Sequence, residues 1–189
     1  MGSIMSARLA AEVDHAMERN GWTAGLAKKA SEGTVLAGFR DVLEGRAQIK
    51  PIEHLIDCDA DPFVPEKGWF VDEHKRDGVI QWNPKKVKLY LSFRQYLGFE
   101  IWGEDLRVVL ASQSVMNANV LDYLLREEKQ HLIPKEWGHC IFFWGTIYRS
   151  LSSGRCVRYL YKHDGRWGSS GFPLCSRLDG YNPAAVFVS

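Results

Sequence analysis

Three aspartates recur at every second position of one otherwise apolar segment, at Asp57, Asp59 and Asp61. Divalent cations such as Mg²⁺ and Ca²⁺ prefer several carboxylate oxygens, so this spacing is compatible with a metal site or with the site of a metal-dependent hydrolase. In an extended strand the three carboxylates would share one face and repel one another unless a cation or basic side chains compensated them. Glu73 and His74, from the next predicted strand, could complete such a site.

The same residues also fit a turn, because aspartates before a proline commonly accept hydrogen bonds from nearby backbone N–H groups. The EF-hand register fails, since Pro62 occupies the position of the required glycine and Gly68 that of the bidentate glutamate. Cys58 lies between two aspartates, which should raise its pKa and make it a poor nucleophile. The sequence favours a structural turn and leaves a cation site, a catalytic carboxylate site and an interaction surface as alternatives.

Aromatic and basic residues alternate in the last fifty residues and form a second candidate site. On one face their rings could stack on bases or sugars, while guanidinium groups bind phosphates or carboxylates. The alternative is a sheet with its aromatic residues buried and its arginines in solvent. The residues concerned are Tyr148, Arg149, Arg158, Tyr159, Tyr161, Arg166 and Trp167.

The composition is that of an ordinary globular protein, with 189 residues, 46% hydrophobic and 25% charged. Twenty-four Lys and Arg residues against 23 Asp and Glu residues give a net charge of +1, which argues against duplex DNA as a partner. The four widely spaced cysteines predict reduced thiols in a cytoplasmic protein. We find no signal-peptide pattern and no apolar run of the ~20 residues that a membrane span needs.

Helical periodicity is confined to the first part of the chain. Leu9, Val13 and Met17 recur at a spacing of four and predict a helix from Ala7 to Arg19. Two further helical patterns follow, from residue 23 and over 35–43. These patterns predict a helical segment over residues 1–45 and a separate domain over 46–189. A helix-turn-helix is disfavoured, because no cluster of Arg, Gln or Asn lies where it would read bases.

Beyond residue 45 short extended runs alternate with Pro and Gly. Strands are expected at 69–71, 79–82 and 87–91, and Asp77-Gly78 predicts that the first two pair as a hairpin. Helical patterns from Gly103 to Leu110 and after Asn117 predict two helices that pack together.

Strand formers then dominate residues 140–149, 156–163 and 167–174, with turns at 152–154 and 164–165. They predict an antiparallel meander whose first strand is covered on both faces, with Gly145 at a bulge or a close backbone contact. The predicted fold class is α+β: N-terminal helices are followed by a mixed domain with a C-terminal antiparallel β-meander packed on helices.

Several segments occur together in a characteristic order, namely IDCDADPFVP at 56–65, NANVLDYLL at 117–125, FWGTIYR at 143–149, VRYLY at 157–161 and GRW at 165–167. In these segments the chain resembles a family of uncharacterised small bacterial proteins, from about Gly33 to Ser189. The resemblance implies one coherent unit and brings no activity with it.

No complete catalytic motif is present in the sequence. We therefore expect a non-enzymatic cytosolic binding or regulatory protein, of bacterial or mobile-element type, that contacts a protein or a nucleic acid through the aromatic and basic sheet face. The alternative is a metal-dependent hydrolase that uses Asp57, Asp59 and Asp61 with His74. No cofactor is expected other than a possible divalent cation.

Overall fold

The computed structural model describes residues 5–50, 52–138, 140–152 and 154–188. The chain divides into two compact units, Met1–Pro51 and Ile52–Ser189, which are described separately below. Helices and strands are both abundant, and the helices of the first unit precede the strands, so the predicted α+β class is confirmed.

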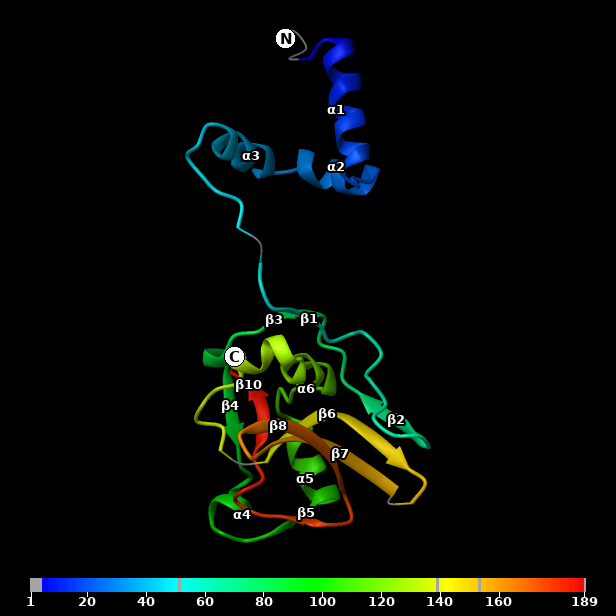
Figure 1. Ribbon diagram of the computed structural model, residues 1–189, viewed down its shortest axis with the longest axis vertical. Coiled ribbons are helices and arrows are strands. Elements are labelled where there is room, and N and C mark those ends of the chain that lie inside the picture. Colours follow the sequence, from blue (N-terminus) through cyan, green and yellow to red (C-terminus); the bar gives the residue numbers. More distant parts are fainter. Residues whose placement is uncertain (1–4, 51, 139, 153, 189) are drawn as a thin grey trace. The chain divides into compact units, whose positions relative to one another are not determined.

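The first unit consists of the helices α1 (Ala7–Arg19), α2 (Ala24–Ser31) and α3 (Val35–Leu43) (Figure 1). Two of them begin as the sequence predicts, because the side chains of Ser6 and Thr23 accept hydrogen bonds from the first turns of α1 and α2. Among the described residues of this unit only Ala30 is buried. The apolar stripes of α1 and α3 are therefore at most half-buried within the unit, as at Val13 and Phe39, and Leu9 and Leu36 are exposed.

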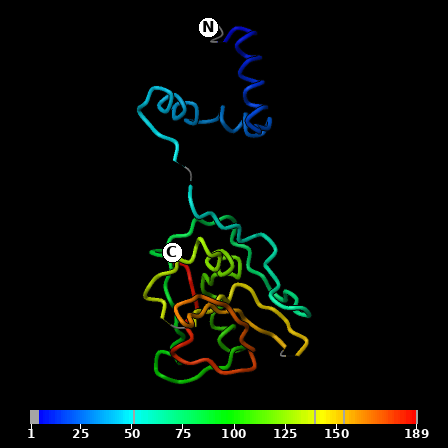
Figure 2. Tube along the Cα trace, in the orientation of Figure 1, coloured from blue at the N-terminus to red at the C-terminus, as the bar shows by residue number. Residues whose placement is uncertain are grey.

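The main sheet of the second unit contains six strands among the described residues. Its order is β4 (Val87–Tyr90), β10 (Ala184–Phe187), β6 (Ile141–Ser150), β7 (Gly154–His163) and β8 (Arg166–Pro173), with β2 (Trp69–His74) also pairing with β6. The strands β6, β7 and β8 form the predicted antiparallel meander. Near the end of the chain β10 lies between β4 and β6, antiparallel to the first and parallel to the second (Figure 2).

Two short strand pairs lie outside this sheet. β1 (Leu55–Asp57) pairs with β3 (Val79–Gln81), and β5 (Ile101–Trp102) pairs with β9 (Arg177–Leu178). The predicted hairpin between the segments at 69 and 79 is therefore wrong, since β2 pairs with β6 instead. Residues 75–78 form no regular turn; Gly78 has a positive φ of 72° and is held by the β1 loop, because Cys58 N donates to Gly78 O and Gly78 N donates to Asp59.

The helices of the second unit are α4 (Phe93–Tyr96), α5 (Gly103–Leu110) and α6 (Ala118–Leu125), with 3-10 turns at Pro84–Lys86 and Glu127–Leu132. We expected α5 and α6 to pack on each other, and this is wrong. The buried side chains of α6 belong to one core cluster with Ile141 and Phe143, whereas those of α5 belong to another with Phe142 and Trp144. Because successive residues of β6 point to opposite faces, the two helices cover opposite sides of the sheet.

Gly145 lies where β6 passes closest to α6. A Cβ atom at this position would lie 2.8 Å from both the Cα and the N of Asn117, and Gly145 N donates to Met116 O at 2.8 Å. The register between β6 and β7 also shifts between Phe142 and Ile147. The predicted close backbone contact at Gly145 is therefore confirmed.

Candidate functional site

The aspartates of the β1 loop act as hydrogen-bond acceptors for the backbone and for an arginine. The Asp57 carboxylate accepts from Asp59 N at 2.9 Å and from Ala60 N at 3.2 Å, which is the geometry of an aspartate turn. The Asp59 carboxylate accepts from Gly78 N at 2.8 Å, and Asp61 lies 3.2 Å from Arg76. All three carboxylates thus have partners within the protein, namely backbone N–H groups for Asp57 and Asp59 and the Arg76 guanidinium for Asp61.

His74 is held within the fold through both ring nitrogens. Its Nδ1 lies 2.8 Å from Thr146 Oγ1, and its Nε2 lies 3.1 Å from Cys58 O. In the part of the chain that the structure describes, no three His, Cys, Asp or Glu side chains are grouped so that they could hold a metal ion. Among the described residues the three aspartates and His74 are therefore not assembled into a metal site.

The N-terminus of α6 holds the aspartate loop. Asn117 donates from Nδ2 to Cys58 O and Lys75 O, at 2.9 Å in each case, while its Oδ1 caps α6 by accepting from Asn119 N. Asn119 donates from Nδ2 to the carbonyl oxygens of Asp57 and Ala60. The segments IDCDADPFVP (56–65) and NANVLDYLL (117–125) therefore contact each other, and their polar residues have a structural role.

Cys58 is fully buried beside this loop. Burial, and after it the charge of Asp77, raises the pKa of Cys58 from 9.0 to about 11. Below pH 9 the thiol is protonated in both states, whereas between pH 9 and pH 11 only the unfolded chain loses the proton. Stability should therefore fall over this window, by about 2–3 kcal/mol in total.

The alkaline loss of stability is measurable as the free energy of unfolding in urea between pH 8 and pH 11. We expect Cys58→Ala to decline less steeply than the parent protein over this range, because every other thiol and phenol is unchanged. Parallel curves for the two proteins would show that Cys58 does not retain its proton in the fold.

The predicted aromatic and basic residues do not share one sheet face. Arg158 is 3% exposed and points toward α6, where its guanidinium binds the Asp122 carboxylate at 2.8 Å and Ser169 Oγ at 3.0 Å. Tyr148 lies on the same side, with its hydroxyl donating to Phe63 O at 2.9 Å. These two residues are parts of the core and cannot contact a partner in the folded state.

Tyr159 points to the other face of the sheet, where its ring stacks on Phe142 at 5.0 Å. Strand alternation explains the separation, since neighbouring residues such as Arg158 and Tyr159 must lie on opposite faces. Arg166 and Trp167 do come together with Tyr161 at the end of the β7–β8 hairpin, where they line a shallow depression of about 490 Å³.

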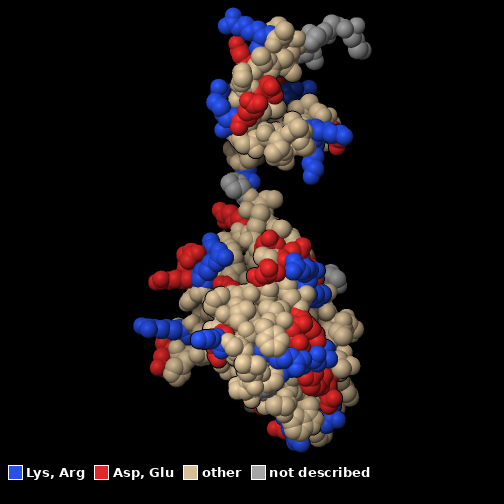
Figure 3. Space-filling model, turned by 90° about the vertical axis from the view of Figure 1, so that its right-hand side faces the viewer, with Lys and Arg blue, Asp and Glu red and all other residues tan. Residues whose placement is uncertain are grey.

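Arg149 belongs to a network of compensated charges at the sheet edge. Asp72 binds both Arg149 and Arg155, at 3.1 and 2.7 Å. Partial burial alone would raise the pKa of Asp72, but the hydrogen bonds and charges of the two arginines outweigh it and lower the pKa below 3.8. Blue and red atoms lie beside each other on the face drawn in Figure 3, so this side presents no large patch of one sign.

A feature that sequence reasoning missed lies on α4, β5, α5 and the segment between α4 and β5. Large apolar side chains are exposed there, with relative exposures from 40% at Val109 to 78% at Tyr96. We call this set the aromatic surface and define it by Phe93, Tyr96, Leu97, Phe99, Trp102 and Val109.

The aromatic surface rests on a rigid support. Gln95 is 2% exposed; its Oε1 accepts from Ser92 N at 3.0 Å, and its Nε2 donates to Asp179 O at 2.8 Å and to Asn182 O at 3.3 Å. This buried amide fixes the single turn of α4 to the segment before β10. Phe93 and Tyr96 therefore lie in solvent on a turn that the hydrogen bonds of buried Gln95 anchor to the rest of the fold.

Charged side chains border the aromatic surface. The β5–β9 pair places the Arg177 guanidinium 4.6 Å from the centre of the Trp102 ring, and Arg177 Nη1 lies 3.3 Å from Glu100. Trp102 and Val109 line a depression of about 430 Å³, together with Arg94, Glu100, Ile101, Asp105 and Arg177. Two arginines and two acidic residues make this depression neutral overall.

Fold and surface together define an α+β protein with a six-stranded mixed sheet and an exposed aromatic surface beside it. No family model, curated protein or solved structure matches this chain. The similarity to uncharacterised bacterial proteins accordingly stays a prediction. Among the described residues no helix has the length and apolar character needed to cross a membrane.

Proposed function

We propose that this chain is a non-enzymatic binding protein, and that the aromatic surface is the site at which it binds a protein partner. The observation that carries the proposal is the exposure of Phe93, Tyr96 and Trp102 on a frame fixed by the buried Gln95. Large apolar side chains exposed on consecutive segments, over residues 93–109, favour association, because a partner removes them from water. A rigid support also lowers the entropy lost on binding.

The chemistry of this surface favours a protein over a nucleic acid. Trp, Tyr and Arg are the residue types that contribute most to the energy of protein–protein interfaces. A nucleic acid would instead require an excess of basic side chains along its phosphates. Here the two arginines are balanced by Glu100 and Asp105. We therefore expect a partner with an apolar cluster surrounded by polar groups of both signs.

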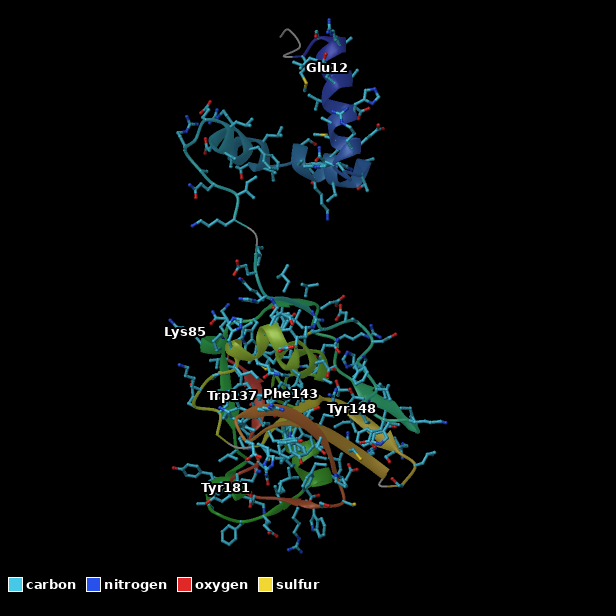
Figure 4. The ribbon with its side chains drawn as sticks, in the orientation of Figure 1. Glu12, Lys85, Trp137, Phe143, Tyr148 and Tyr181 are labelled. Carbon is cyan, nitrogen blue, oxygen red and sulfur yellow. The ribbon has the colours of Figure 1, made fainter. Side chains whose placement is uncertain are left out.

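Site-specific photo-crosslinking tests the proposal. Tyr96 is replaced with p-benzoylphenylalanine in cells that make the protein, and Lys85 is replaced in the same way as a control. Lys85 is exposed and lies at a distance from Tyr181, which adjoins the α4 end of the unit (Figure 4). We expect a discrete protein adduct from position 96 that is absent from position 85.

A second substitution makes the test specific. Trp102→Ala in the chain labelled at position 96 should reduce the adduct at least tenfold, since truncating a hot-spot residue typically costs ~2 kcal/mol or more of binding energy. Adducts of equal yield from positions 85 and 96, or an adduct that survives Trp102→Ala, would contradict the proposal.

A further inference from the structure

β8 forms one edge of the main sheet. It pairs with β7 along its whole length, from Arg166 to Pro173, and among the described residues no strand pairs with its other side. None of its eight residues is buried, whereas β6, inside the sheet, is buried almost throughout. An unpaired edge presents a row of backbone N–H and C=O groups on which another strand can form.

The edge of β8 lacks the features that protect the other edges of this sheet. β2 has a register shift between Val71 and Glu73 and carries two acidic residues, and β4 is four residues long and carries Lys88. β8 is longer, keeps a continuous register with β7, and has one charged residue, Arg166, at its first position. Because proteins usually protect edges that are to stay unpaired, this difference indicates that β8 has a pairing partner.

The geometry of the β7–β8 hairpin identifies the backbone groups that face outward. Its turn consists of Asp164 and Gly165, with φ values of 47° and 79°, so the flanking residues His163 and Arg166 exchange hydrogen bonds. Hydrogen-bonded pairs alternate along an antiparallel ladder, so every second residue of β8 from Arg166 onward bonds to β7. The residues whose N–H and C=O groups point outward are therefore Trp167, Ser169 and Gly171.

These outward groups are self-complementary. We infer that β8 pairs with β8 of a second copy of this chain, antiparallel and about a two-fold axis at Ser169. In this register Trp167 of each copy lies opposite Gly171 of the other, so the bulky indole faces a residue without a side chain. Each outward N–H and C=O group then has a partner. Arg166 lies opposite Phe172, and the positive charge of each strand avoids its counterpart.

The two neighbouring registers fit less well. An axis at Ser170 would place Trp167 opposite Pro173, which has no N–H to donate. An axis at Gly168 would place Gly171 opposite the turn residue Gly165, beyond the end of the strand. The sequence of β8 therefore specifies one register with a second copy. This inference is independent of the proposed function, because β8 carries no residue of the aromatic surface.

Sedimentation equilibrium of the full chain measures this association. We expect a reversible dimer with a dissociation constant on the order of 10 μM, as for other small interfaces. Ser170 is exposed, and in the dimer its side chain lies diagonal to Arg166 of the second copy. Ser170→Arg should therefore weaken the dimer at least tenfold through like-charge repulsion. The uncharged Ser170→Gln is the matched control and should dimerise nearly as the parent does.

Amide hydrogen exchange in the parent protein shows whether the dimer uses this edge. The N–H groups of Trp167 and Gly171 should exchange at least tenfold more slowly above the dissociation constant than below it. Those of Ser170 and Phe172, which bond to β7, should exchange slowly at both concentrations. A protein that stays monomeric well above this concentration, equal dimerisation of the two Ser170 variants, or exchange at Gly171 that is independent of concentration would overturn the inference.

Discussion

Asp122→Ala is expected to lower the free energy of unfolding by about 3–5 kcal/mol, because it leaves the buried Arg158 guanidinium without its counter-charge. Arg158 lies over the rings of Phe63 and Tyr148. Water therefore cannot easily solvate its guanidinium after the Asp122 carboxylate has been removed. Only uncharged groups such as the Ser169 hydroxyl and the Tyr148 ring remain beside it among the described residues. The measurement is urea denaturation of the parent and the variant at pH 7.

Removing both charges provides the control for this prediction. Burial raises the pKa of Asp122 above its usual value even though Arg158 opposes the shift. The pair therefore costs desolvation energy in the native protein, and Asp122→Leu with Arg158→Met should be more stable than Asp122→Ala alone. If the unfolding free energy of Asp122→Ala lies within ~1 kcal/mol of that of the parent, the Arg158 guanidinium is not buried as described.

Gly145→Ala is expected to destabilise the second unit by about 3 kcal/mol or more, because overpacking against backbone cannot be relieved by rotating a side chain. The new methyl group would lie 2.8 Å from the Cα and N of Asn117. The strand and helix would have to separate, which weakens the bonds from Gly145 N to Met116 O and from Lys75 N to Gly145 O.

Gly138→Ala is the matched control for this substitution. A Cβ atom at Gly138 would meet only Glu136 O, at 3.9 Å, so the same chemical change should be nearly neutral there. Thermal unfolding of both variants gives the comparison. Equal melting temperatures for the two variants would contradict the close approach of β6 and α6.

Short-range patterns in the sequence predicted the helices, strands and helix cap that depend on residues close together in the chain. The helix stripes of the first unit, the strands β6, β7 and β8, and the cap of α6 at Asn117 all follow from patterns within about ten residues. Gly145 predicts a bulge or a close backbone contact, because glycine within a strand often marks one of the two.

Long-range pairing could not be predicted in the same way. β2 pairs with β6 across more than seventy residues, and β10 is a four-residue strand with no distinctive pattern. The predicted hairpin was wrong because the Asp77-Gly78 turn signal specifies a turn and not the partner of the strand before it.

The candidate site was missed because large apolar residues are usually interpreted as core. Phe93, Tyr96 and Phe99 look like core residues in the sequence, and only the structure shows that they lie in solvent. The pairing of Ser92 with Gln95 was the available signal, since a capping box marks the start of a helix turn and thereby fixes which side chains point outward.

Calorimetric titration of the partner captured at position 96 tests the central claim most directly. We predict that Trp102→Ala binds this partner at least thirtyfold more weakly than the parent protein, the effect of losing ~2 kcal/mol at a hot-spot residue. Lys85→Ala should bind as the parent does, and the unfolding free energies of all three proteins should agree within ~1 kcal/mol. Undiminished affinity in Trp102→Ala would contradict the assignment of the aromatic surface as the binding site.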